Sequence, residues 1–178
     1  MTASKHSPHS LRHHFLVASP YLADPRFHGA VIYLCEHSDD GALGLMINQP
    51  LDIHLGEILE QLDMHGGPVE PERGFVLHPP GTNWQNTARV HDEVLLTTSR
   101  DVLAGIGKNQ GPEEFLVALG YSGWSEGQLE EELGSNSWLT CPASTDILFR
   151  TPWEDRYQAV LKLIGIDLNQ LSESIGHA

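Results

Sequence analysis

The sequence is short of cysteine, of positive charge and of long apolar runs, and each shortage excludes a class of protein. Its 178 residues contain only two cysteines, Cys35 and Cys141, which are too few for a disulfide framework and indicate a reducing compartment. Ten Lys and Arg residues against 24 Asp and Glu residues give a net charge of −14. Nucleic-acid binding relies on basic side chains that neutralise phosphates, so direct nucleic-acid binding is disfavoured and a basic protein partner is easier to accommodate.

Membrane spans and secretory signals are also missing from the sequence. No apolar run reaches the roughly 18 residues that a transmembrane helix needs. The N-terminal stretch MTASKHSPHSLRHHFLVASP has no long apolar region before a cleavage site. The sequence therefore predicts a cytoplasmic protein without a membrane partner.

The chain shows no internal repeat and no linker, so we expect one folded domain at residues 13–178. Residues 1–12 are polar and rich in histidine, and we expect a flexible tail there. Its histidines predict no metal site, because nothing holds such ligands in a fixed geometry.

Strand patterns recur along this domain. An apolar run at 30–36, a turn at Ser38–Gly41 and a second run at 42–48 predict a β-hairpin. Residues 88–99 fit two short strands or one bent strand, and the run Phe115–Leu119 fits a strand better than a helix because it is short. Further strands are expected at 13–20, 74–77, 138–143 and 145–149.

Helices are expected where apolar residues recur at helical spacing or where capping residues stand. Residues 51–62 carry one apolar stripe, and residues 99–107 begin at a potential N-cap, Ser99. Residues 151–165 begin with Thr-Pro and end on glycine. These patterns predict an α+β fold: a single domain with a mixed, mostly antiparallel sheet and about four helices packed on it.

The stretch GYSGWSEGQLEEEL, residues 120–133, contains G-x-S-x-G, the pattern of the nucleophile elbow in α/β-hydrolases. The match is poor, because several residues separate the preceding apolar run from Ser125 and only His177, next to the C-terminus, follows as a triad histidine. Ser125 followed by Gln128 also fits a capping box. We therefore favour a helix cap over a nucleophile and predict no catalytic residue.

Cys35 and His37 stand two positions apart at the end of a predicted strand, so both side chains are expected on one face. This spacing suits a thiolate beside an imidazole, or two ligands of a metal whose other ligands have no candidates. We favour a small core residue at Cys35, keep a reactive thiol as the alternative, and predict no metal site. The consecutive carboxylates Glu130–Glu132 point in different directions on a helix and predict a solvated face.

The best polar constellation is Thr97-Thr98-Ser99-Arg100-Asp101. A helix N-terminus with hydroxyls and an arginine can hold an anion, whereas an N-cap with an ordinary ion pair is the competing interpretation. Asn48, at the end of the hairpin, and Gly67, in a glycine-proline turn, are candidates for lining the same cleft. The candidate ligand-binding residues are therefore Ser99, Arg100, Asn48 and Gly67.

Nine segments stand in a distinctive order: HHFLVASP, VIYLCEH, GALGLMINQP, GGPV with RGFVLH, TTSRDVL, LVALGYSGW, GQLEEEL, WLTCPA and the terminal GHA. Together they resemble the bacterial AlgH/YqgE family over nearly the whole chain, from Leu11 to Ala178. The family pattern G-Y-x-x-W-x-x-G-Q-L-E is matched by this chain, but the position of Ser125 is not a fixed serine in it. The resemblance implies a compact fold in which the sheet curls toward a barrel and helices flank it.

The resemblance implies no agreed reaction, cofactor or catalytic residue, although one member names the family as a regulator of alginate biosynthesis genes. The leading interpretation is therefore a cytoplasmic regulator without enzymatic activity, which acts through contact with a protein or a small ligand. The alternative is a small enzyme or anion-binding module that uses Ser99, Arg100 and Asp101. We expect no cofactor, and the expected partner is an unidentified protein or a small anionic ligand.

Overall fold

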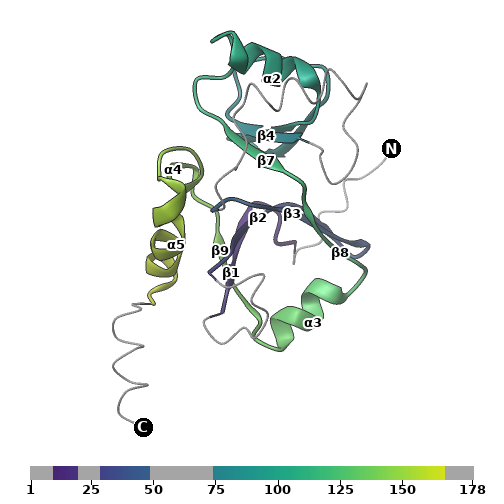
Figure 1. Ribbon diagram of the computed structural model, residues 1–178. Coiled ribbons are helices and arrows are strands. Elements are labelled where there is room, and N and C mark those ends of the chain that lie inside the picture. Colours follow the sequence, from purple (N-terminus) through teal and green to yellow (C-terminus); the bar gives the residue numbers. More distant parts are fainter. Residues whose placement is uncertain (1–9, 20–28, 49–73, 167–178) are drawn as a thin grey trace.

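The computed structural model describes residues 10–19, 29–48 and 74–166, and its strands form two antiparallel sheets (Figure 1). The first sheet has the strand order β8-β3-β2-β1-β9 and consists of β1 (His14–Ala18), β2 (Val31–Ser38), β3 (Gly41–Met46), β8 (Ser122–Trp124) and β9 (Trp138–Pro142). The second sheet has the order β5-β6-β4-β7 and consists of β4 (Gly74–His78), β5 (Thr87–His91), β6 (Val94–Thr97) and β7 (Leu116–Leu119). Each pair of neighbouring strands is antiparallel.

Four α-helices lie within the described residues: α2 (Arg100–Gly107), α3 (Gln128–Gly134), α4 (Thr145–Phe149) and α5 (Arg156–Ile164). A 3₁₀ turn at Trp153–Asp155 leads into α5, which ends at Gly165 in the left-handed conformation, with φ 91°. None of the described helices is long and apolar enough to cross a bilayer.

The alternation of side chains along the strands places the core between the two sheets. In β1 and β2, Phe15, Val17 and Val31 belong to a cluster that also contains Phe75 and Leu77 of β4. The residues between them point the other way, so that Leu16 and Ile32 pack with Leu129 of α3. The central strands are thus buried on both faces, which explains their nearly continuous apolar sequences.

Two helices, α2 and α3, cover the outer faces of this sandwich, and α4 and α5 lie beside the sheets (Figure 1). Val76 of β4 points away from the shared core and packs against Val102 and Leu103, so α2 covers the outer face of the second sheet. The first sheet is covered by α3 on its outer face, and α4 and α5 add Ile147, Leu148, Val160 and Leu161 to the shared core. The order of layers is therefore α2, second sheet, first sheet, α3.

The α+β class and the predicted hairpin are confirmed, and four helices are described, in agreement with the predicted number. The strands form two sheets instead of one, and these sheets do not close into a barrel. The predicted strand at 145–149 is wrong, because these residues form α4. Ser144 caps that helix by accepting a hydrogen bond from the Ile147 N–H, at 3.3 Å between nitrogen and oxygen. The predicted helix at 51–62 lies outside the described residues.

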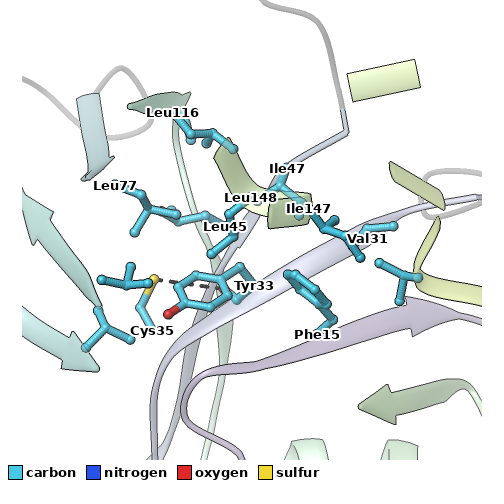
Figure 2. Close-up of a cluster of buried hydrophobic side chains, with 14 of the residues drawn as sticks. Phe15, Val31, Tyr33, Cys35, Leu45, Ile47, Leu77, Leu116, Ile147 and Leu148 are labelled. Carbon is cyan, nitrogen blue, oxygen red and sulfur yellow. Dashed lines mark hydrogen bonds between the residues drawn. The ribbon is translucent and has the colours of Figure 1, made fainter. Parts of the chain in front are cut away.

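A bulge in β2 overturns the prediction that Cys35 and His37 share a face. Leu34 pairs with Gly44 and Glu36 pairs with Leu43, so Cys35 is an extra residue opposite the β3 ladder. Cys35 enters the shared core beside Tyr33, as Figure 2 shows. The alternation is shifted beyond the bulge, and His37 points instead toward α3.

Candidate functional site

Residues 10–14, which lead into β1, join the two sheets and border two cavities. The guanidinium of Arg12 donates from Nε to the Val90 carbonyl at 2.8 Å and from Nη2 to the Arg89 carbonyl, both on β5. Because β5 belongs to the second sheet, these two hydrogen bonds hold the residues just before β1, a strand of the first sheet, against the second sheet. Arg12 also lines both cavities.

The first of these, the β5 cavity, has a volume of about 390 Å³ and is lined by Ser10, Arg12, His13, Arg89, Val90, His91 and Asp92. The rings of His13 and His91 are stacked, with centroids 3.8 Å apart and planes at 5°. Arg89 and Asp92 form an ion pair of 3.6 Å in which both side chains are largely exposed. In a chain of net charge −14, this cavity gathers two of the ten Lys and Arg residues together with two imidazoles.

The hydrogen bonds of His13 in this cavity indicate which of its ring nitrogens carries the proton. Burial raises the pKa of the Tyr33 hydroxyl above its usual range, so Tyr33 is a phenol. Among the described residues its hydroxyl has Nδ1 of His13, at 2.8 Å, as its one hydrogen-bond partner, so we assign the phenol as the donor and Nδ1 as the acceptor. Nε2 of the neutral His13 ring therefore carries the proton. Burial, with the neighbouring His91 and His14, lowers the pKa of His13 to about 4, which keeps the ring neutral.

The second cavity, the His37 cavity, has a volume of about 560 Å³ and contains Arg12, Glu36, His37, Asp40 and Trp124 in its wall. His37 is not available there as a base. Its Nδ1 accepts the Leu11 N–H at 2.8 Å, and its Nε2 donates to Glu130 at 2.6 Å. Both ring nitrogens are thus occupied, and His37 ties the segment before β1 to α3.

The predicted cluster at the start of α2 is largely paired with itself and with the preceding loop. Ser99 donates to Asp101 at 2.5 Å and accepts the Asn86 N–H at 3.1 Å. The carboxylate of Asp101 also accepts the backbone N–H groups of Val102 and Gln85. Asp101 rather than Ser99 therefore satisfies a free amide of the first turn, and its negative charge already lies at the helix N-terminus.

Arg100, between these two residues, is different. Its side chain is half-buried, and Nη2 is buried without a hydrogen-bond partner. None of the ion pairs seen within residues 10–19, 29–48 and 74–166 includes it. One nitrogen of this guanidinium has thus lost water and has gained no carboxylate among the residues that the structure describes.

The other candidate residues do not gather around Arg100 within the described part of the chain. The side-chain amide of Asn48 accepts the Val31 N–H at 2.8 Å and donates to the Gly29 carbonyl at 2.7 Å. These bonds join the segment after β3 to the start of β2. Gly67 lies outside the described residues. Cys35 is 1% exposed, and burial raises the pKa of its thiol, which favours a core role over thiolate chemistry.

The region of Ser125 also differs from its prediction. The N-cap of α3 is Gly127, with φ 75°, rather than Ser125. The Gln128 side chain accepts the Ser125 N–H at 3.1 Å, which is half of a capping box. The Ser125 hydroxyl donates to the same Gln128 oxygen and caps no backbone amide, so the predicted cap role of the hydroxyl is wrong.

The three glutamates of α3 are only partly a solvated face. Glu132 accepts from the indole nitrogens of Trp124 at 2.7 Å and Trp138 at 2.9 Å, and Glu130 pairs with His37. Only Glu131 is exposed without a side-chain partner among the described residues. The sequence carried no local signal for the pairing of Glu130, because its partner His37 lies 93 positions away.

Sequence reasoning also missed His78, which is fully buried in the second sheet together with Thr97, the first residue of the predicted polar cluster. His78 donates from Nδ1 to the Pro79 carbonyl at 2.9 Å, and its Nε2 accepts from the Thr97 hydroxyl at 2.7 Å. The pair has the hydrogen-bond pattern of a nucleophile with its base, but no substrate reaches atoms with no exposed surface. Within the described residues, no three His, Cys, Asp or Glu side chains gather as metal ligands would.

Comparisons with known proteins agree with this fold. The family model described as AlgH-like matches residues 15–169. A UPF0301 protein of Nitrosospira multiformis is 49% identical over 181 aligned residues, covering 94% of this chain and 97% of the relative. A UPF0301 protein of Chromobacterium violaceum is 47% identical, with 95% and 98% covered.

Two solved structures extend the comparison. The solution structure of the AlgH protein from Pseudomonas aeruginosa is 46% identical, with a TM-score of 0.79 and 97% of each chain covered. A protein of Corynebacterium diphtheriae, DIP2367, has a TM-score of 0.64 at 16% identity and 84% coverage of this chain, which shows a shared fold alone. With a family model over most of its length and relatives near half identity, this chain belongs to the AlgH-like family.

Proposed function

We propose that the protein is a regulator without enzymatic activity, and that it responds to a small anionic ligand bound by Arg100. The observation that carries the proposal is the buried Nη2 atom of Arg100, which has no hydrogen-bond partner. A buried donor left unpaired costs about 1–3 kcal/mol, and more when it is charged. Nη2 itself has no exposed surface, so we infer that an anion at the start of α2 draws the half-buried guanidinium toward itself, which gives Nη2 an acceptor and removes this cost.

Within the described part of the chain, the two other half-buried arginines support this interpretation by contrast. Arg156 donates to three backbone carbonyls, and Arg12 donates to two. The fold therefore supplies acceptors to guanidinium groups elsewhere. An arginine fork suits a carboxylate or a phosphate, which is the class of ligand that we propose.

The alternative of a small enzyme at Ser99, Arg100 and Asp101 receives less support. The Ser99 hydroxyl donates to Asp101 and accepts an amide, and Asp101 uses both carboxylate oxygens. A nucleophile needs a base with a free acceptor for its proton, and both oxygens of Asp101 already accept hydrogen bonds from backbone amides. The two free cysteines support a cytoplasmic location, where thiols stay reduced.

The test compares Arg100→Met with Arg150→Met. Arg150 is an exposed arginine paired with Glu114 and Asp146, so it controls for the loss of a positive charge. We expect Arg100→Met to raise the melting temperature of the ligand-free protein, because methionine has no donor to leave unpaired. We expect Arg150→Met to leave it nearly unchanged.

The second readout is site-resolved. Inorganic phosphate and citrate are titrated into the full chain while the amide signals of the first turn of α2 and the Nε–H signal of Arg100 are followed by NMR. Saturable shifts that vanish in Arg100→Met support the proposal. A lower melting temperature for Arg100→Met, with no shift of these signals by either anion, contradicts it.

A further inference from the structure

The β5 cavity is the second place where this acidic chain concentrates cationic and hydrogen-bond-donating groups, and Arg100 does not line it. From the arrangement of its side chains we propose that it binds a small molecule carrying a phosphate or carboxylate group, through Arg12, Arg89, His13 and His91. This site differs from the one at Arg100, rests on different observations, and was not suggested by any sequence motif.

The first observation is that one donor group of the cavity, the Arg12 guanidinium, is fixed before a ligand arrives. The guanidinium of Arg12 is held by two carbonyls of β5 through Nε and Nη2. These bonds leave Nη1 without a partner among the described residues. A donor group whose orientation is already set loses little entropy on binding, which favours recognition over a flexible surface contact.

The second observation is the state of the two imidazoles. The Tyr33 hydroxyl donates to Nδ1 of His13, and the Glu93 N–H points to Nδ1 of His91 at 3.4 Å. Both rings therefore carry their proton on Nε2, and neither Nε2–H has a protein acceptor within the described chain. Two imidazole N–H donors and two guanidinium groups together form a set of donors that suits an oxyanion and offers little to a cation.

The third observation is backbone strain at His13. Its φ is 61°, in the left-handed region that a residue with a side chain rarely adopts. Its backbone is held there on both sides, because its N–H donates to the Leu34 carbonyl and its carbonyl accepts the Ala143 N–H. Strain of this kind is retained where a side chain must be aimed, and here it brings His13 onto the ring of His91.

The one carboxylate of the cavity does not satisfy these donors. Asp92 contacts Arg89 at 3.6 Å, and its side chain is 91% exposed, so the pair is a weak surface ion pair. A ligand oxyanion can replace Asp92 at Arg89 at small cost. The cavity volume of about 390 Å³ leaves room for an organic group beyond the anion.

The experiment uses the full chain with labelled histidines. Inorganic phosphate and citrate are titrated separately while the imidazole signals of His13 and His91 are followed by NMR, and the stronger of the two identifies the preferred anion. We expect saturable shifts of both rings. Arg89→Gln removes an exposed guanidinium, and His91→Phe keeps a stacked ring but loses the Nε2–H, so each should weaken binding by about tenfold or more.

Two controls separate this site from others. Arg150→Gln removes an equally exposed arginine elsewhere and should leave the affinity unchanged. Arg100→Met should also leave it unchanged, so failure of the site at Arg100 and failure of this one give different patterns. Absence of a saturable imidazole shift with either anion overturns the proposal, as does binding that Arg89→Gln and His91→Phe leave at full strength.

Discussion

His37 and Glu130 are joined by a hydrogen bond of 2.6 Å between Nε2 and Oε1, across 93 positions of the chain. Because Nδ1 of His37 accepts the Leu11 N–H, the proton of the ring lies on Nε2 and points at the carboxylate. This hydrogen bond lowers the pKa of Glu130. A carboxylate whose pKa is lower in the folded state adds stability above its unfolded pKa, and that stability is lost as the pH falls through its folded pKa.

We therefore expect Glu130→Gln to lower the free energy of unfolding at pH 7. The side chain of Glu130 is 52% exposed, so solvent screening limits the loss to less than about 1 kcal/mol. Glu131→Gln, one position along and exposed, is the matched control and should have no effect. Urea denaturation of both variants checks this, and an equal effect of the two substitutions would show that helix charge, not the pairing with His37, is responsible.

For Ser125→Ala we expect a change in the free energy of unfolding of less than about 0.5 kcal/mol, because its hydroxyl meets only the Gln128 side chain at the surface. Gln128→Ala should cost more, about 1 kcal/mol, since it removes the acceptor of the Ser125 N–H and a donor to Glu132. Denaturant titration ranks the two. A fluorophosphonate probe should not label Ser125, and covalent labelling would restore the nucleophile hypothesis.

The two cysteines should differ in reactivity. Cys35 lies in the shared core, and burial raises the pKa of its thiol, whereas Cys141 on β9 is only half-buried. We expect iodoacetamide to modify Cys141 first in the native protein and to reach Cys35 only after addition of urea. Mass spectrometry of peptides over time measures both. Rapid native labelling of Cys35 would support the alternative of a sensing thiol.

The pH dependence of stability should report on His13. Its pKa is lowered from 6.5 to about 4, first by burial and then by His91 and His14, while Arg12 and Tyr33 also lie against it. The unfolded chain therefore binds this proton more readily between about pH 4 and 6.5, and stability falls as the solution is acidified through that window. A shift of this size corresponds to at most about 3 kcal/mol, and partial solvent access reduces it.

The variant His13→Asn removes this titration, and asparagine tolerates the left-handed backbone at that position. We expect its free energy of unfolding to vary less than that of the parent chain between pH 4 and 6.5. Urea titrations at several pH values give both curves. Parallel curves would mean that other groups cause the acid sensitivity.

The charge of the chain predicts no retention of generic duplex DNA at physiological salt, because a net charge of −14 repels phosphates. Fluorescence anisotropy with a labelled duplex tests this. A micromolar dissociation constant that weakens steeply with salt would show that Arg12 and Arg89 act as a local basic patch.

Apolar runs bounded by turns were enough to predict most of the strands, because the nearly continuous runs along 30–36 and 42–48 reflect the burial of the central strands on both faces. The prediction failed at Cys35, where one inserted residue in β2 reverses which side chains face the core. It failed again at 145–149, because a short apolar run fits a helix and a strand equally well. The residue that decides for a helix is Ser144, a typical N-cap residue that stands directly before the run.

The candidate sites also differ in how far the sequence predicts them, according to whether their contacts are local. The start of α2 with Ser99 and Arg100 was recognisable because a cap and a helix are local features. The pairing of Arg12 with the β5 backbone joins positions 77 and 78 apart. No local pattern encodes such a contact, which depends on how the two sheets meet.

The strand order also has a consequence for synthesis on the ribosome. The second sheet comes from one uninterrupted stretch, residues 74–119, whereas the first sheet needs β8 and β9, which follow that stretch. Until residue 142 emerges, β1 keeps one edge without its β9 partner, and an open edge invites pairing with another chain. A pause in translation between β7 and β9 would lengthen this exposed interval, so the nascent chain most needs a chaperone there.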